Sequence, residues 1–275
     1  MHTASYCVRF GHRFVSMVAF CSVAFGFGGY AAMAQQPAAA TIQAPAQIPA
    51  QAPVQIPKVL PDPLRTDWPN LKRFMAEDAK LAAPAPGEKR VVFMGDSITQ
   101  GWARYGVPPE PPVPGTVWVN RGISGQTTPQ MLLRFQQDVI HLKPDVVVIF
   151  AGINDIAGNT GDMTPEQTED NLTSMAELAH ANHIKVVLCS ITPAFDFPWK
   201  PGREPSAKVI ALNSWIKTYA AEHGHVYVDF YSAMVDQRGG LPASLSKDGV
   251  HPTPAGYAIM NPLVEAGIAK ALAGK

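Results

Sequence analysis

Short apolar runs recur along the chain from residue 89 onward. They alternate with longer segments in which apolar residues are spaced three or four positions apart. The runs contain β-branched and aromatic residues without polar alternation, which is typical of strands buried on both faces. They lie at 90–94, 117–120, 145–151, 185–191 and 226–230. Strands that alternate with helices in this way predict a parallel sheet of five strands, covered on both faces as a three-layer α/β/α sandwich.

The segments between the strands carry the start and stop signals of helices. Three begin at a threonine followed within two positions by proline, a combination favoured at helix N-termini. The three starts are Thr127 or Thr128, Thr164 and Thr253. A further helix, with apolar residues from Val209 to Tyr219, is expected to end at Gly224. Pro262 predicts a kink in the last helix.

The first 34 residues have the pattern of a secretory signal peptide. Arg9 and Arg13 precede an apolar run that is interrupted by glycines, and the small residues of Ala32-Met33-Ala34 form a cleavage signal. A retained N-terminal anchor is the alternative. The signal-peptide interpretation predicts an exported product, periplasmic or extracellular, without stable membrane insertion after cleavage.

The residues after this segment divide into three parts. Residues 35–63 consist largely of Gln, Ala, Pro and Ile, which predicts a disordered, polyproline-rich tether. Residues 64–87 predict an amphipathic helix over 67–82, capped by Asp67, and a proline-rich linker. Its apolar face would consist of Trp68, Leu71, Phe74 and Met75. Residues 88–275 form one predicted domain that contains all five predicted strands.

Composition excludes some partners. The chain is 47% hydrophobic and 16% charged, as expected for a globular protein. Cleavage of the signal peptide would remove two basic residues and no acidic ones, so the mature chain would carry a small negative net charge. We therefore expect no binding to nucleic acid.

Cys189 is the cysteine that remains after cleavage, so no intramolecular disulfide is expected and stability must come from the core.

Four short segments carry the residue types of nucleophilic catalysis. Each falls in a loop after a predicted strand or before the last helix. They are Gly95-Asp96-Ser97, Asn120 to Gly125, Gly152 to Asp155, and Asp248 to His251. Loops at the C-terminal ends of parallel strands carry binding and catalytic residues. Ser97 is therefore expected at the rim of the sheet, where the first turn of the next helix offers N–H groups to an anion.

These residue types suit one reaction. A serine hydroxyl is a poor nucleophile unless a base accepts its proton, which histidine can do near neutral pH. His251 is the candidate base, and a tight turn would let Asp248 hold its tautomer. A tetrahedral oxyanion also needs donors. The candidates are the side-chain amide of Asn154 and the backbone N–H groups of Ser97 and Gly125.

Each segment has a simpler interpretation when it is taken alone. The serine can merely cap a helix, an Asp-x-x-His pair can arise by chance, and Gly-x-Asn-Asp is a good turn sequence. Gly122 also competes with Gly125, although the spacing from Asn120 favours Gly125. The occurrence of all four segments in this order favours catalysis.

In this order the segments resemble blocks I, II, III and V of the GDSL-type hydrolases, also called SGNH hydrolases. The resemblance covers residues 89–275. It implies a flavodoxin-like sheet of five parallel strands and ester hydrolysis by a Ser-His-Asp triad. By position it implies Ser97 as nucleophile, His251 as general base and Asp248 as the residue that orients it. It also implies an oxyanion hole made of Ser97, Gly125 and Asn154.

The segment from Gly95 to Gly101 excludes two other kinds of site. It lacks the second glycine of the Gly-x-Ser-x-Gly elbow of α/β-hydrolases. It also lacks the Lys-Ser/Thr of a nucleotide-binding Walker loop. Ile98 stands where the family name has leucine, which is a conservative difference.

Other candidates lie outside the four segments. Phe195, Phe197 and Trp199 follow the fourth strand and either wall a substrate pocket or anchor a long loop. His180 and His183 have a spacing that can ligate a metal, but solvated imidazoles near a helix C-terminus are the favoured interpretation. We therefore expect no metal and no cofactor.

Together these features predict an exported serine esterase that acts through an acyl-enzyme intermediate. Its expected substrates are small-molecule or glycan esters with short acyl groups, and acetyl groups on carbohydrate fit an exported enzyme. A lysophospholipase or thioesterase of the same fold is the alternative within this chemistry. From another class, the domain could be a non-catalytic wall- or carbohydrate-binding module, an interpretation supported by the long tether.

Overall fold

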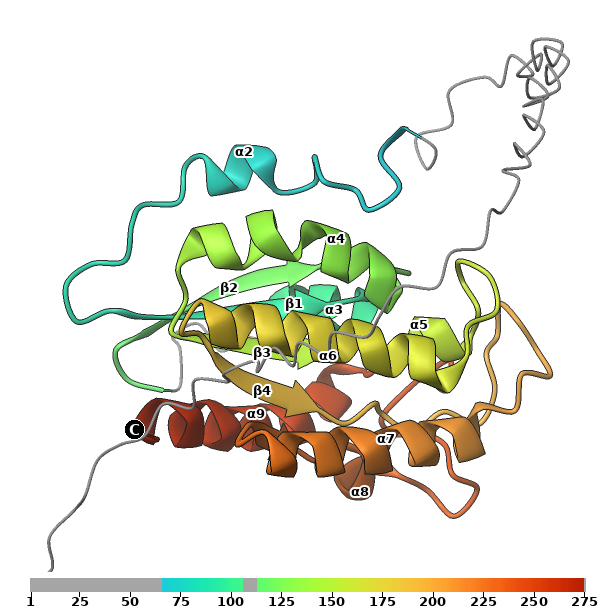
Figure 1. Cartoon of the computed structure of the whole chain (residues 1–275). Helices are drawn as coiled ribbons and strands as arrows, with labels where there is room; N and C mark the ends of the chain where they lie inside the picture. The colour runs from blue at the N-terminus through green and yellow to red at the C-terminus, as the bar shows by residue number, and fades with distance from the viewer. Residues whose placement is uncertain (1–65, 106–112, 275) are drawn as a thin grey trace, which may run out of the picture. The chain divides into compact units, whose positions relative to one another are not determined.

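The computed structural model describes residues 66–105 and 113–274 (Figure 1). The predicted signal peptide at 1–34 and the predicted tether at 35–63 lie outside the described residues. Within the described ranges, no helix combines the length and the apolar character needed to cross a membrane.

A five-stranded parallel sheet forms the centre of the domain, as the sequence predicted. Its strands are β1 (Lys89–Gly95), β2 (Thr116–Gly122), β3 (Val146–Phe150), β4 (Lys185–Cys189) and β5 (Val226–Val228). All pairings are parallel, and the order across the sheet is β2-β1-β3-β4-β5. This is the flavodoxin-like order, in which the chain turns toward opposite edges of the sheet after β1 and after β3.

Helices cover both faces of the sheet. They are α3 (Ser97–Tyr105), α4 (Thr128–Asp138), the 3-10 turn η1 (Ile140–Leu142), α5 (Ile153–Ile156), α6 (Pro165–Ala181), α7 (Pro205–Glu222), α8 (Tyr231–Met234) and α9 (Pro254–Ala273). One buried cluster joins the sheet to α4, α6 and α7, and a second joins it to α3, α8 and α9. In Figure 1 the layer of α4, α6 and α7 faces the viewer.

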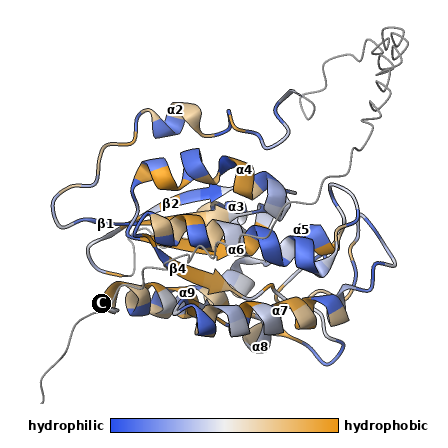
Figure 2. Cartoon of the chain, viewed as in Figure 1, coloured by the Kyte–Doolittle hydropathy of each residue, from blue (hydrophilic) through white to orange (hydrophobic). Residues whose placement is uncertain are grey.

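The side chains of each strand alternate between these two clusters. In β1, Val92 and Met94 enter the cluster under α4, whereas Val91 and Phe93 enter the cluster under α3 and α9. All four side chains are almost fully buried. β4 is drawn almost wholly in the hydrophobic colour, whereas α6 and α7 mix hydrophilic and hydrophobic residues (Figure 2). A sheet buried on both faces explains why the strand sequences lack polar alternation.

Helices α4 and α6 begin directly after the threonines that were predicted to cap them. Thr127 precedes α4 and forms a capping box with Gln130. Thr164 precedes α6, where its hydroxyl accepts a hydrogen bond from the Gln167 N–H at 3.3 Å. α9 runs from Pro254 to Ala273 without an interruption at Pro262.

The predicted helix over 67–82 is replaced by turns and one short helix, α2 (Met75–Asp78). The carboxylate of Asp67 accepts hydrogen bonds from the N–H groups of Leu71 and Lys72, at 2.7 and 3.0 Å. Asn70, however, has a φ of 58°, in the left-handed region that interrupts a right-handed helix. We call residues 66–82 the N-terminal arm.

Candidate active site

Ser97 lies at the point where β1 passes into α3. β1 ends at Gly95, and a Cβ at this position would lie 2.7 Å from the Phe150 carbonyl oxygen and 2.0 Å from the Thr99 hydroxyl. Only glycine fits this crossing between strands and helix. Ser97 is the first residue of α3, so its N–H has no acceptor within the helix.

His251 comes from the loop before α9 and meets Ser97 across the rim of the sheet. The Ser97 Oγ and the His251 Nε2 are 2.9 Å apart, within hydrogen-bond distance. The His251 Nδ1 lies 2.7 Å from the Asp248 Oδ2. Hydroxyl, imidazole and carboxylate therefore form a continuous hydrogen-bonded chain.

The second carboxylate oxygen of Asp248 is held by its own loop. It accepts hydrogen bonds from the backbone N–H groups of Val250 and His251, at 3.0 and 2.8 Å, and from the Ser246 hydroxyl at 3.1 Å. Partial burial acts to raise the pKa of Asp248, but the hydrogen bonds from the His251 N–H, the imidazole and the Val250 N–H outweigh it and lower the pKa to about 2. The carboxylate is thus ionised throughout the neutral range.

The three candidate oxyanion donors come from separate segments of the chain: Ser97 begins α3, Gly125 lies in the loop after β2, and Asn154 lies in α5. Gly125 has a φ of 77°, and its N–H makes no hydrogen bond to another described residue. Asn154 is buried in α5, directly after β3. Its Nδ2 donates to the Gln126 carbonyl at 3.0 Å and to the Asp96 Oδ2 at 3.3 Å. The longer bond to Asp96 places the Asn154 amide beside the residue that precedes Ser97.

Asn159 is a site residue that the sequence analysis missed. Its Nδ2 donates to the Asn154 Oδ1 at 2.8 Å and to the Gly125 carbonyl at 3.2 Å. Its Oδ1 accepts a hydrogen bond from the Trp199 Nε1 at 3.1 Å. One amide therefore connects two candidate oxyanion donors to the loop after β4. In sequence, Asn159 looks like an ordinary turn residue after a glycine, so local pattern offers no signal for this role.

The three candidate pocket aromatics occupy different environments. Phe197 is fully buried in the core and packs against Trp199, with ring centroids 5.2 Å apart. Trp199 is 40% exposed, and its ring lies 5.9 Å from the His251 ring. Phe195 is exposed and lies beside Arg238 instead. A cavity of about 250 Å³ between Phe195 and Arg238 reaches Asp248. Of the three aromatics, Trp199 is the one that borders the imidazole.

The remaining candidates take no part in this arrangement. His180 lies in the last turn of α6, and His183 follows it with a φ of 61°. Within residues 66–105 and 113–274, no three His, Cys, Asp or Glu side chains are placed to hold a metal ion together. Cys189 is buried in β4, and burial raises its pKa, so it behaves as a small core residue.

Asp96 and Asp155 are buried carboxyl groups beside the site. Burial raises the pKa of Asp96 to about 7, against hydrogen bonding from the Ile98 N–H and the proximity of His251, while the Asp155 charge raises it further. Burial likewise raises the pKa of Asp155 to about 6, although Thr128 donates hydrogen bonds to it from both its hydroxyl and its N–H. Each carboxyl therefore braces a loop while retaining a proton more readily than in water.

Asp96→Asn is expected to flatten the pH dependence of stability. The pKa of Asp96 rises from 3.8 to about 7 on folding, so the folded protein holds this proton more tightly than the unfolded chain does. Proton binding therefore stabilises the fold fully below pH 3.8, and this stabilisation is lost as the pH rises to the folded-state pKa of about 7. Between about pH 4 and 7, wild type should lose roughly 3 kcal/mol more unfolding free energy than the variant. Urea unfolding followed by circular dichroism measures this, and equal pH slopes would contradict the raised pKa.

Comparison with known proteins places the chain in a family. The model of the GDSL-like lipase/acylhydrolase family matches residues 93–259, more than half of the chain. Esterase TesA of Pseudomonas aeruginosa is 34% identical over 134 residues, which cover 49% of this chain and 60% of TesA. An acetylxylan esterase of Geobacillus stearothermophilus is 29% identical over 205 residues, which cover 63% of this chain and 90% of that enzyme.

A solved structure is similar over nearly its whole length. The crystal structure of a GDSL-like lipase from Bacteroides thetaiotaomicron is 45% identical and superimposes with a TM-score of 0.68, covering 74% of this chain and 99% of that one. The chain therefore belongs to the GDSL-like lipase/acylhydrolase family of ester hydrolases.

Proposed function

We propose that the protein is a serine esterase in which Ser97 is the nucleophile, His251 the general base and Asp248 the residue that orients the imidazole. The observation that carries this proposal is the hydrogen-bonded chain from the Ser97 Oγ through His251 to Asp248, with distances of 2.9 and 2.7 Å. These are the contacts that nucleophile activation requires. The ionised Asp248 would stabilise the imidazolium that forms.

The reaction would proceed in two steps. The Ser97 Oγ attacks the ester carbonyl while His251 Nε2 accepts the hydroxyl proton, giving a tetrahedral oxyanion. Collapse of this intermediate breaks the bond to the alcohol, which leaves with the proton from His251. A water molecule then attacks the acyl-enzyme, with His251 again as base, and releases the acid and the free Ser97.

The oxyanion would be held by the N–H groups of Ser97 and Gly125 and by the Asn154 amide. Asn154 donates to the Gln126 carbonyl at 3.0 Å and, less closely, to Asp96 at 3.3 Å. The second of these bonds is the one that the amide would exchange for the oxyanion. The oxyanion would then form beside an amide that needs to exchange only one hydrogen bond. Donors that need so little rearrangement are the usual source of the largest catalytic effect.

Trp199 would contact the alcohol part of the substrate. The leaving oxygen must approach His251 Nε2 to take its proton, so the leaving group lies on the side of the imidazole. The Trp199 ring lies 5.9 Å from the imidazole ring and is held in place by Asn159 and Phe197. A fixed indole face suits the apolar face of a sugar ring. The relatives named acetylxylan esterase support an acetylated carbohydrate as substrate.

Trp199→Ala should therefore impair sugar esters selectively. We expect kcat/KM for acetylated xylooligosaccharides to fall roughly tenfold, as the loss of one good aromatic contact would cause. For ethyl acetate, which has the same acyl group and a small alcohol, the change should stay below about threefold. Steady-state kinetics with both esters measures the difference.

Phe195→Ala is the matched control, because Phe195 is an exposed aromatic of the same loop whose ring contacts the Arg238 guanidinium, whereas the Trp199 ring contacts the imidazole. It should leave both substrates unchanged. Equal losses on the two esters in Trp199→Ala would remove Trp199 from the alcohol subsite without affecting the triad.

Export and short acyl groups complete the proposal. Export is supported by the signal-peptide pattern of residues 1–34, and the mature enzyme would then meet its substrate in the periplasm or outside the cell. A short acyl group is supported by the acetylxylan esterases among the relatives. A series of acetyl, butyryl and octanoyl esters, together with an acyl thioester, separates this activity from that of a lysophospholipase or thioesterase.

A further inference from the structure

The N-terminal arm is bound to the catalytic domain through three glutamine side chains at and before α4. Each donates its amide N–H to a backbone carbonyl of the arm. Gln126 donates to the Pro69 carbonyl at 2.7 Å, Gln130 to that of Trp68 at 2.8 Å, and Gln137 to that of Leu71 at 2.5 Å. The arm therefore follows the surface of the domain in a defined register.

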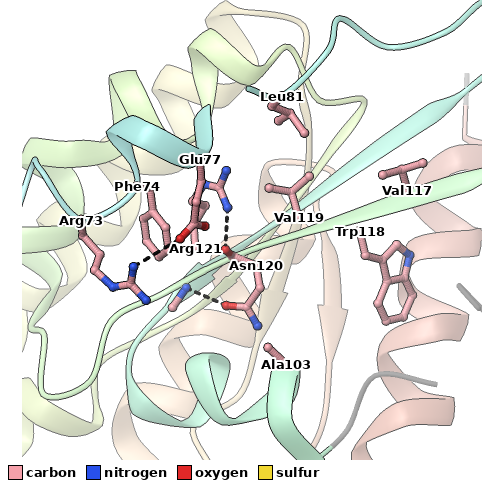
Figure 3. A pocket seen from close by; sticks show the side chains of 11 residues that line it. Arg73, Phe74, Glu77, Leu81, Ala103, Val117, Trp118, Val119, Asn120 and Arg121 are labelled. Atoms are coloured by element: carbon pink, nitrogen blue, oxygen red, sulfur yellow. Dashed lines mark hydrogen bonds and ion pairs between the residues drawn. The ribbon is translucent and has the colours of Figure 1, made fainter. Parts of the chain in front are cut away.

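The arm also packs against β2, which is one of the two edge strands of the sheet (Figure 3). Phe74 is buried between the guanidinium groups of Arg73 and Arg121, each 4.7 Å from its ring. Arg121 of β2 forms an ion pair with Asp78 of the arm. A cavity of about 410 Å³ remains between the arm and the strand. These contacts hold the arm independently of the three glutamines.

Gln126 differs from the other two glutamines because it also contacts the candidate oxyanion hole. Its backbone carbonyl accepts the hydrogen bond from the Asn154 amide at 3.0 Å. Its side-chain Oε1 accepts from the Arg134 Nε at 2.6 Å. Arg134 is fully buried and also donates to the Gly95 carbonyl, two residues before the serine, at 3.1 Å. Gln126 thus joins the arm, the nucleophile loop and the oxyanion loop.

We infer that Gln126 is a positioning residue through which the N-terminal arm holds the Asn154 amide in place for catalysis. The inference rests on the proposed oxyanion hole. Both ends of the Gln126 side chain are bound, one to Pro69 of the arm and the other to Arg134. Its backbone carbonyl therefore has little freedom to rotate. Because that carbonyl orients Asn154, loosening it displaces an oxyanion donor, and small displacements of such groups reduce turnover strongly.

The first test compares two glutamines that bind the same arm. Gln126→Ala should lower kcat for p-nitrophenyl acetate roughly tenfold with KM changed less than about twofold, because the Asn154 amide acts in the transition state. Gln137→Ala removes a similar hydrogen bond to the arm, and its other bond is to Asp138, whose second oxygen keeps the ion pair with Arg134. It should therefore stay within about twofold of wild type. Equal kcat in the two variants would overturn the proposal.

A second variant removes the hydrogen bond from Gln126 to the arm while keeping the one that it accepts from Arg134. In Gln126→Glu the carboxylate can still accept from Arg134, which also favours folding, but it cannot donate to the Pro69 carbonyl. A kcat at least about threefold below wild type is expected if the arm positions Asn154. Wild-type kcat in a folded Gln126→Glu protein would overturn the proposal, because the bond to the arm would then be dispensable.

A double-mutant cycle identifies the group through which Gln126 acts. In an Asn154→Ala background, Gln126→Ala should cost less than about threefold in kcat, since the amide that it positions is already absent. An equal loss in both backgrounds would overturn the proposal. None of these outcomes depends on whether Ser97→Ala is inactive, so a failure of the triad assignment remains distinguishable from a failure of this inference.

Discussion

Ser97→Ala should lose about 10⁴-fold or more in kcat for p-nitrophenyl acetate, as the removal of a triad nucleophile does. The variant has no hydroxyl to attack the ester, and the neighbouring His251 can at best activate water in its place. Because Ser97 is only partly buried and its hydroxyl bonds to His251, the fold should remain intact. Steady-state hydrolysis, with circular dichroism to check folding, measures the effect.

Ser124→Ala is the matched control for this prediction. Ser124 is an exposed serine in the adjacent loop, immediately before Gly125, so its replacement should leave kcat within about twofold of wild type. An organophosphate ester should also label wild type and Ser124→Ala once, on Ser97, and leave Ser97→Ala unlabelled in mass spectra. Undiminished turnover in Ser97→Ala would exclude the proposed mechanism.

Asn154→Ala should lower kcat by roughly 10²–10³-fold, the effect of removing one oxyanion donor, with little change in KM. The amide is buried between Asp96 and the Gln126 carbonyl and is held by Asn159. Its removal deletes a donor that is already oriented, and water in its place would have to be ordered during the reaction. Pre-steady-state measurement of the acyl-enzyme burst shows whether the loss falls on acylation.

Asn171→Ala provides the comparison for Asn154→Ala. Asn171 is an asparagine on α6 whose amide donates to the Thr128 hydroxyl at 3.1 Å and to the Gln167 carbonyl at 2.7 Å. It should affect stability slightly and turnover by less than about threefold. If Asn154→Ala changed kcat by no more than this, Asn154 would have no part in the oxyanion hole.

The layered fold could be derived from sequence because its determinants are local. Runs such as Val146–Phe150 are apolar on both faces, and this alone requires a sheet that is covered by other elements on both of its faces. The helix starts at Thr127 and Thr164 depend on hydrogen bonds within three residues of the cap. The Asp248–His251 pair is also a short-range feature, which one turn brings together.

The N-terminal arm shows where local signals fail. The apolar spacing of Trp68, Leu71, Phe74 and Met75 predicts a helix, yet of these four only Phe74 is fully buried. The arm takes its conformation from contacts with partners far along the chain, including Arg121 and the glutamines of α4. Such contacts override a helical propensity that amounts to only a few tenths of a kcal/mol per residue.

The sequence by itself determined the order of strands and helices, the parallel sheet, and the residue types that stand in the loops at its rim. Only the tertiary structure decided that the Ser97 hydroxyl and the His251 imidazole, 154 positions apart, meet at 2.9 Å. It also decided that Asn159, Gln126 and Arg134 hold the loops around them. The physical reason is that periodicity reports which face of an element is buried, whereas a polar side chain finds its hydrogen-bond partner only once distant loops are packed together.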